Sequence, residues 1–177
     1  LGADFVIGFG PELDERVAPL VQGPIHVAEG ETSLFEELLQ NPESMASRAF
    51  NNPPLLDTNL PNTRAWRAAE IPAANGHASA AALATIYGKL AAGELLSAAV
   101  LEEARTCQAE GQDEILPLVT KVACGFMLAP AHEPCGPNPK AFNHAGAGGS
   151  LGYCDPEAKL GLGYVMNNMH SGVWLVD

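Results

Sequence analysis

The pattern of apolar and polar residues predicts helices in the middle of the chain and strands toward its end. The clearest helical pattern covers 78–92, ASAAALATIYGKLAA, where alanine dominates and larger apolar residues recur three or four positions apart. Gly93 follows it, as is typical of the residue after a helix end. A second helix is predicted over 98–109, with Ser97 as its N-cap.

Before these helices the pattern is less regular. Residues 4–9, DFVIGF, predict a short strand, and 11–32 are broken by proline and glycine. Ser33 is the expected N-cap of a helix over 34–40, and one or two further helical turns are expected over 43–49. The proline- and asparagine-rich stretch 50–76 predicts a long loop anchored by Trp66, with His77 capping the helix that follows.

After the helices, we expect 110–121 to be a connection and the rest to be β-structure. Predicted strands cover 124–129, 141–146, 149–155 and 160–169. Asp155-Pro156-Glu157-Ala158 reads as the turn between the last two. Glycines within these strands indicate close approach of another backbone: Gly152, Gly161 and Gly163.

Helices followed by a run of strands predict an α+β fold, or an α/β sandwich, with an antiparallel sheet flanked by helices. The composition fits one globular domain, since 47% of the 177 residues are hydrophobic and 17% are charged. The net charge of −12 argues against a nucleic acid or an anionic membrane surface as partner. It favours a neutral or weakly charged small molecule as ligand.

The four cysteines, Cys107, Cys124, Cys135 and Cys154, form no C-x-x-C pair. A chain of this size needs no disulfides, so we expect free thiols in a reducing compartment. No signal peptide is evident, and the expected location is the cytoplasm. The spacing of Cys124, His132 and Cys135 matches no zinc pattern, so neither a metal nor another cofactor is expected.

A glycine cluster follows His144 in the stretch HAGAGGSLGY. It lacks the spacing of a Rossmann fingerprint and the G-K-[ST] of a P-loop, and a strand follows it in place of a helix. A phosphate cradle is therefore disfavoured. Two readings remain open: tight backbone packing, and the lining of a reaction site.

The stretch 144–169, with HAGAGGSLGY, DPEA, LGLGYVMN and a final Met, resembles the last signature of the serine β-lactamase-like esterases. These proteins are related to class C β-lactamases and D-alanyl-D-alanine carboxypeptidases. Residues 62–77 resemble the segment that leads into the family's alanine-rich helix. The resemblance implies a β-lactamase/transpeptidase-like fold and a serine hydrolase acting on a small ester, amide or β-lactam.

In that family a Lys-Thr-Gly or His-x-Gly motif lies on the sheet edge beside the active site, and His144-Ala145-Gly146 matches it. The resemblance implies that the N–H of Ala147 forms half of an oxyanion hole. It also implies that Ala145, Gly146 and Gly148 line the substrate, which pairs with the strand edge as an added strand would. His144 would orient the substrate or move protons.

The chain departs from the family pattern in several places. Ala145 stands where a hydroxyl is usual, and neither S-x-x-K nor Y-x-N/S occurs. The family also ends with a helix after the last strand. We therefore expect residues 1–177 to be the C-terminal part of one β-lactamase-like domain, with 1–76 as helical and loop portion and 77–177 as helices plus strands.

In this interpretation the nucleophile lies upstream, in a missing N-terminal portion of the same protein or in a complementary chain. The alternative is a catalytically inactive scaffold or binding module with the same fold.

Overall fold

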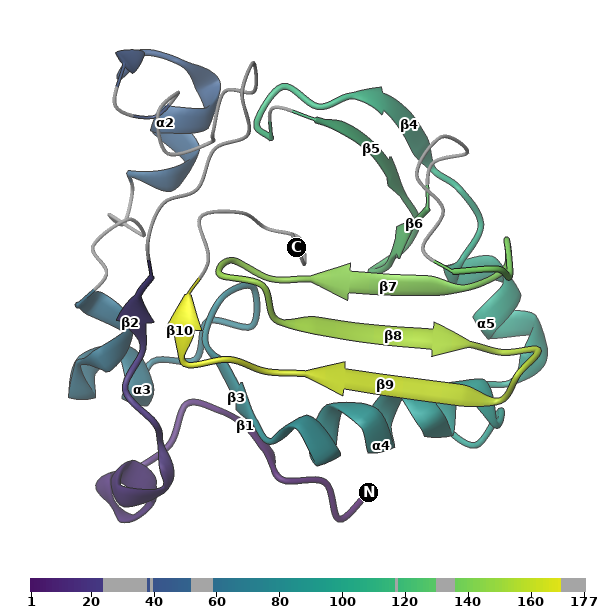
Figure 1. The fold of residues 1–177 in the computed structure, drawn as a ribbon, viewed down its shortest axis with the longest axis horizontal. Helices are drawn as coiled ribbons and strands as arrows, with labels where there is room; N and C mark the ends of the chain where they lie inside the picture. Colours follow the sequence, from purple (N-terminus) through teal and green to yellow (C-terminus); the bar gives the residue numbers. More distant parts are fainter. Residues whose placement is uncertain (24–37, 39, 52–58, 117, 130–135, 170–177) are drawn as a thin grey trace.

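A computed structural model describes residues 1–23, 38, 40–51, 59–116, 118–129 and 136–169. Most of the predicted helix over 34–40, together with His132 and Cys135, lies outside the described residues. Within them the elements follow the predicted order, with helices before a run of strands (Figure 1).

The main sheet has six antiparallel strands, and each pairs with the next one along the chain. Because neighbouring strands run antiparallel, no crossover connection is needed. In spatial order the strands are β4 (Ala109–Gln112), β5 (Val119–Val122), β6 (Met127–Leu128), β7 (Phe142–Ala145), β8 (Leu151–Asp155) and β9 (Leu160–Tyr164).

The predicted turn between β8 and β9 is present and is held by Asp155. Its carboxylate Oδ1 accepts hydrogen bonds from the backbone N–H groups of Glu157 and Ala158, at 3.0 and 2.9 Å. Lys159 completes the turn at a φ of 53°, in the left-handed region. The turn fixes the register that pairs Gly152 with Gly163 and Cys154 with Gly161.

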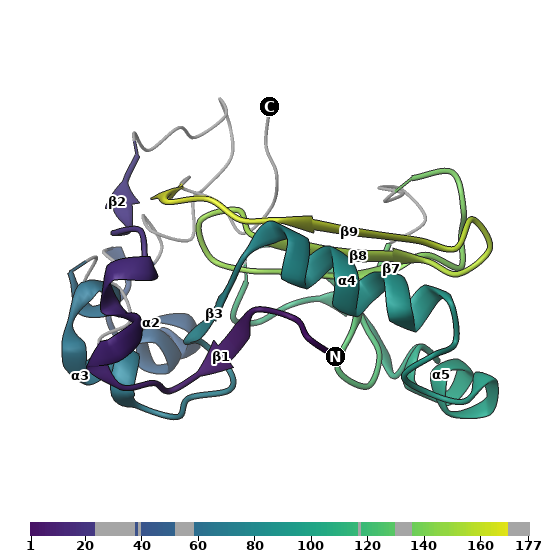
Figure 2. The ribbon, with the colours of Figure 1, turned by 90° about the horizontal axis from the view of Figure 1, so that it is seen from below.

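The long helix α4 (Ala80–Ala91) lies against one face of β8 and β9 (Figure 2). Glycines make this contact possible: a Cβ placed on Gly161 would lie 2.5 Å from the Gly88 Cα, and one on Gly163 2.5 Å from the Ala80 carbonyl oxygen. A Cβ on Gly152 would meet the Tyr87 ring. The predicted close approach at these three positions is confirmed.

The core lies between α4, α5 (Ala98–Ala104) and the strands β6, β7 and β8. Phe142 of β7 and Cys154 of β8 are fully buried there. They form one cluster with Leu90, Ala91 and Leu101 of the two helices. Removing this apolar surface from water is the main stabilising contribution to the packing.

The N-terminal part is built from short elements. β1 (Phe5–Ile7) pairs antiparallel with β3 (Gly76–Ala78), and β2 (Val21–Gln22) pairs parallel with β10 (Asn168–Met169). The helical turns are η1 (Pro11–Arg16), α2 (Met45–Phe50), η2 (Leu60–Asn62) and α3 (Arg64–Ala68).

Trp66 of α3 is buried, as expected for the anchor of this loop-rich part. Beside it, the Asn75 side chain is 1% exposed. Asn75 donates hydrogen bonds to the carbonyl oxygens of Trp66 and Ala69, at 2.8 and 2.6 Å, and accepts one from the Ile71 N–H at 3.0 Å. These bonds replace regular structure in holding the segment together.

Several sequence-based boundaries are wrong. Residues 110–112 and 119–121 lie in the paired strands β4 and β5 in place of a connection, and the helix predicted over 98–109 ends at Ala104. His77 lies in β3, and the cap of α4 is Ser79, whose hydroxyl accepts from the Ala82 N–H at 3.1 Å. The strand expected over 124–129 shrinks to β6, and that over 160–169 divides into β9 and β10. Pairing with distant segments sets these limits.

Candidate active site

Among the described residues, the half of β7 that carries the predicted site has no strand paired with it on one side, which we call its open side. β6 pairs with β7 only at Phe142 and Asn143, whereas β8 pairs along the whole of β7. The Gly146 N–H bonds back to the Ser150 carbonyl oxygen at 2.8 Å, on the β8 side. Because backbone amides alternate in direction along a strand, the Ala145 N–H is directed to the open side.

A tight turn follows β7 and carries Ala147. The Gly149 N–H donates to the Gly146 carbonyl oxygen at 3.0 Å. Gly148 and Gly149 have φ values of +84° and +106°, which side chains rarely adopt. Ala147 is exposed, and its N–H makes no hydrogen bond within the part of the chain that the structure describes. The turn therefore presents the unpaired Ala147 amide next to the open edge.

Gly148, predicted to line the substrate, is buried on the inner side of this turn. A Cβ at Gly148 would lie 2.8 Å from the Met166 Cε and 2.9 Å from the Met169 Cε. The two methionine side chains therefore press directly on the turn, and only glycine leaves room for them. The sequence pattern indicates core-like methionines but gives no sign of this contact.

His144 is exposed, and its Nδ1 lies 2.7 Å from the carbonyl oxygen of Ala145. A carbonyl oxygen only accepts hydrogen bonds, so this contact requires Nδ1 to carry the proton. In the neutral ring, Nε2 is then the acceptor. His144 can thus receive a proton or a hydrogen bond at Nε2.

Sequence reasoning missed Asn143, the neighbour of His144. It is 2% exposed, and its Oδ1 is a buried acceptor without a hydrogen-bond partner among the described residues. Strand alternation turns its side chain to the opposite side of the sheet from His144. Its place directly before His144 in the strand is the sequence signal that could have found it.

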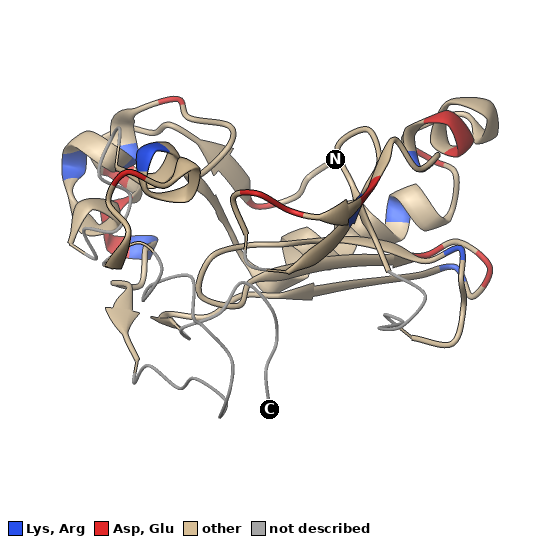
Figure 3. Ribbon diagram, turned by 90° about the horizontal axis from the view of Figure 1, so that it is seen from above, with Lys and Arg blue, Asp and Glu red and all other residues tan. Residues whose placement is uncertain are grey.

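The strands that carry the site are almost free of charge. Of the residues in β7, β8 and β9, only Asp155 carries a negative charge, and it is the last residue of β8. Figure 3 shows the distribution of Lys, Arg, Asp and Glu over the ribbon. Hydrogen bonds from the Ala158 N–H and the Asn138 amide keep the pKa of Asp155 below its usual range. An electrically neutral ligand suits this edge better than a charged one.

Other predicted features lie apart from this edge. Cys107, Cys124 and Cys154 are free thiols. The described residues contain no cluster of three metal-ligating side chains, and none of their helices is long and apolar enough to cross a membrane. An open groove of about 310 Å³ follows β4 and β5 and includes none of the predicted site residues.

Comparison with known proteins identifies the family and the fold of the chain. The model of the β-lactamase family matches residues 23–174. The esterase/β-lactamase LipL of Mycobacterium tuberculosis (strain ATCC 25618 / H37Rv) is 38% identical over 112 residues, which are 62% of this chain and 26% of LipL.

Two solved structures share the fold over nearly the whole chain. A family VIII carboxylesterase is 35% identical with a TM-score of 0.76, covering 94% of this chain and 42% of its own. A penicillin-binding protein homologue from Caulobacter crescentus is 34% identical with a TM-score of 0.78, covering 98% of this chain and 45% of its own.

These matches confirm the predicted β-lactamase/transpeptidase-like fold. The chain spans less than half the length of these relatives. With a family match over most of its residues, this chain belongs to the β-lactamase family.

Proposed function

We propose that the protein containing this chain is a serine hydrolase of the esterase/β-lactamase type, which cleaves an ester or amide through an acyl-enzyme. The observation that carries the proposal is the unpaired Ala147 amide at the end of the open β7 edge. Membership of the β-lactamase family and similarity to carboxylesterases support it.

The nucleophile in this proposal is a serine outside residues 1–177, activated by a lysine three positions later. Its hydroxyl proton passes to that lysine as its oxygen bonds to the carbonyl carbon, and the carbonyl oxygen becomes an alkoxide. When the alkoxide collapses, the bond to the leaving alcohol or amine breaks, the leaving group takes up the proton, and water later hydrolyses the acyl-enzyme. The Ala147 N–H is one donor to that alkoxide. The hydrogen bond from such a fixed N–H becomes stronger as negative charge develops on the substrate oxygen. Removing one such donor typically lowers kcat by a factor of about 10²–10³.

The rest of the open edge positions the substrate. A linear part of the substrate lies along β7 as an added strand and bonds to the outward backbone of Ala145. Ala145 lacks a side-chain hydroxyl, so the backbone provides the anchoring at this position. Gly146 and Gly148 keep the turn narrow, and Nε2 of His144 is available to the substrate or to a moving proton.

The substrate we propose is a small, neutral ester, amide or β-lactam, because β7 and β9 contain no charged residue. We further propose the cytoplasm as the compartment, supported by the free thiols of Cys107, Cys124 and Cys154. A second candidate function is a catalytically inactive scaffold, which the lack of S-x-x-K in residues 1–177 favours.

The proposal is tested with Ala147→Pro in the full-length protein. Proline has no N–H, so the donor is lost, whereas Ala147→Ser keeps the amide and adds one atom at an exposed position. The assay is hydrolysis of a p-nitrophenyl ester and of a chromogenic β-lactam, with thermal unfolding as the check on folding. We expect a loss of about 10² or more in kcat for the proline variant only.

Wild-type activity in a folded Ala147→Pro protein contradicts the role of Ala147. Treatment of the wild type with a fluorophosphonate probe separates the two candidate functions. One covalent adduct on a serine supports the hydrolase. The absence of both an adduct and hydrolysis supports the inactive scaffold.

A further inference from the structure

Two methionine side chains lie against the turn that carries Ala147. A Cβ at Gly148 would be 2.8 Å from the Met166 Cε, and 2.9 Å from both the Cε and the Cγ of Met169. Because a Cβ lies about 1.5 Å from its Cα, both side chains are within contact range of Gly148 itself. Both methionines follow β9 in the chain and are half-buried, so they place apolar atoms directly against the turn.

The turn has its most adaptable residue, a glycine, at its centre. Between described residues, the Gly146 N–H donates to the Ser150 carbonyl oxygen at 2.8 Å, and the Gly149 N–H donates to that of Gly146 at 3.0 Å. Gly148 is the third residue of this four-residue turn, with a φ of +84°, as in a type II turn. Glycine has the widest choice of backbone conformations. Contacts with Gly148 therefore limit how far the turn, and with it the Ala147 amide, can move.

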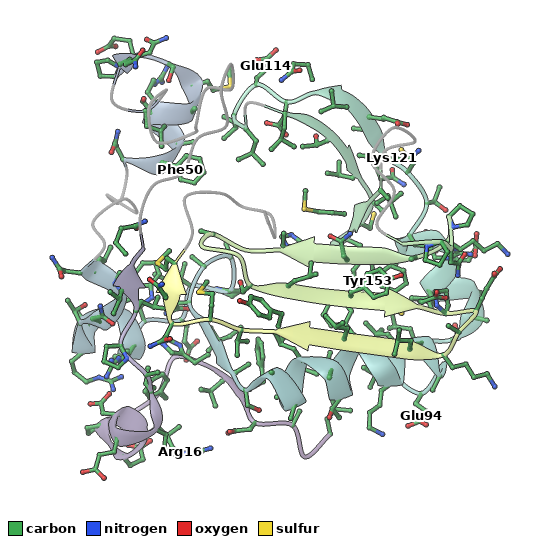
Figure 4. All side chains as sticks on the ribbon, viewed as in Figure 1. Arg16, Phe50, Glu94, Glu114, Lys121 and Tyr153 are labelled. Atoms are coloured by element: carbon green, nitrogen blue, oxygen red, sulfur yellow. The ribbon has the colours of Figure 1, made fainter. Side chains whose placement is uncertain are left out.

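The backbone of Met169 is fixed by the N-terminal part of the chain. Met169 is the second residue of β10 and pairs with Gln22 of β2. Its carbonyl oxygen accepts from the Gly23 N–H at 2.9 Å, and a Cβ at Gly23 would lie 2.5 Å from the same oxygen. Figure 4 shows β10 between β2 and the turn that joins β7 to β8. Met169 therefore connects β2 to the turn.

We propose that Met169, with Met166 beside it, is a positioning residue that holds the Ala147 N–H in the direction the substrate oxygen requires. This role rests on the proposed function, since the amide needs a substrate oxygen to bind. Met169 acts through Gly148 and not by contact with the reacting atoms. An oxyanion donor is effective because it is fixed before charge develops, and a misplacement of about 1 Å can lower the rate about 100-fold.

The first test is Met169→Ala in the full-length protein. This change removes the Cγ and Cε that reach Gly148, whereas Met169→Leu keeps the Cγ and most of the apolar volume. The matched control is Met45→Ala on α2, where the side chain is 56% exposed. Hydrolysis of a p-nitrophenyl ester gives kcat and KM, and titration with a fluorophosphonate gives the number of active sites in each sample.

We expect Met169→Ala to lower kcat per active site by about 10–100-fold, because the amide is misplaced and not removed. KM should stay unchanged, since the lost interaction belongs to the transition state. Met169→Leu should keep most of the activity, and Met45→Ala all of it. A general loss of folding would instead lower the number of active sites. Wild-type kcat in a folded Met169→Ala protein would overturn the proposal.

The second test reaches the turn from β2. In Gly23→Ala the new methyl group presses on the Met169 carbonyl oxygen, whereas in the control Gly88→Ala it would meet nothing within 4 Å. We expect Gly23→Ala to lower kcat and Gly88→Ala to leave it unchanged. In a Met169→Ala background, Gly23→Ala should add little, because both changes act on the same contact. Equal fold-losses from Gly23→Ala in the two backgrounds would overturn the connection through Met169.

Amide hydrogen exchange tests the same contact without catalysis. In Met169→Ala, the amides of Gly146 and Gly149 should exchange with deuterium faster than in the wild type, while those of β8 stay unchanged. Gly23→Ala provides the same measurement if Met169→Ala does not fold. A wild type that hydrolyses no ester contradicts the proposed function, and exchange alone then decides whether Met169 holds the turn. Unchanged exchange at Gly146 and Gly149 in the folded variant would overturn the proposal.

Discussion

Gly161 and Gly88 lie against each other where β9 crosses α4, yet substituting alanine at each should have opposite effects. A Cβ on Gly161 would lie 2.5 Å from the Gly88 Cα and 2.6 Å from the Tyr87 carbonyl carbon. Both are backbone atoms of the helix and cannot rotate away. A Cβ on Gly88 would meet nothing within 4 Å.

The size of each effect follows from this geometry. Forcing one methyl group into a packed contact typically costs about 1–3 kcal/mol, and we place Gly161→Ala at about 3 kcal/mol because the helix itself must move. Gly88 lies inside α4, so Gly88→Ala should stabilise the protein by about 0.5–1 kcal/mol. The two variants should therefore differ by nearly 4 kcal/mol.

Urea unfolding of the full-length protein, followed by circular dichroism, measures both changes. With an unchanged dependence on urea, the midpoints should fall in the order Gly88→Ala, wild type, Gly161→Ala, from highest to lowest. Wild-type stability of Gly161→Ala would refute the close packing of α4 on β9. A loss in Gly88→Ala comparable with that in Gly161→Ala would refute the open space at Gly88.

Three further predictions concern other parts of the fold. Ser79→Ala removes the cap of α4 and should lower the free energy of unfolding by about 1 kcal/mol in the same urea assay. Burial, with a smaller contribution from Cys154, raises the pKa of Tyr87 to about 12. The neutral phenol of Tyr87 therefore contributes its full stabilisation below about pH 10, and this contribution is lost as the pH rises toward 12. Tyr87→Phe should weaken this pH dependence of the free energy of unfolding, measured by unfolding curves at alkaline pH. Burial raises the pKa of the Cys154 thiol to about 11, so peptide mapping after iodoacetamide should find Cys154 unmodified while the exposed Cys107 and Cys124 react.

The pattern of apolar residues along the sequence was enough to predict the long helix and the last strands of the main sheet. The alanine-rich repeat of α4 and the alternation in β7, β8 and β9 were sufficient to place them. The hairpin of β4 and β5 was missed because β4, AEGQ, has no apolar face and is exposed at all four positions. Its strand character comes from pairing with β5, which sequence pattern does not report.

Part of the candidate site was also predictable from the sequence, and part was not. The glycine cluster and the family motif predicted His144 and Ala147 at the end of a strand, and in the described part of the chain β6 does not pair with that end. The packing of Met166 and Met169 on Gly148 was not predictable, because it joins the turn to a segment that follows β9. Contacts of this kind depend on the path of the chain in space.

The parallel pairing of β2 with β10 affects how the protein folds during its synthesis. The Val21 N–H donates to the Asn167 carbonyl oxygen at 2.7 Å, and the Gly23 N–H donates to that of Met169 at 2.9 Å. During synthesis, residues 21–23 leave the ribosome long before 167–169 exist. The early segment must therefore wait for its partner, and closing so long a loop slows folding. Met169 belongs both to this pair and to the packing on Gly148, so the turn that carries Ala147 reaches its final support only at the end of that process.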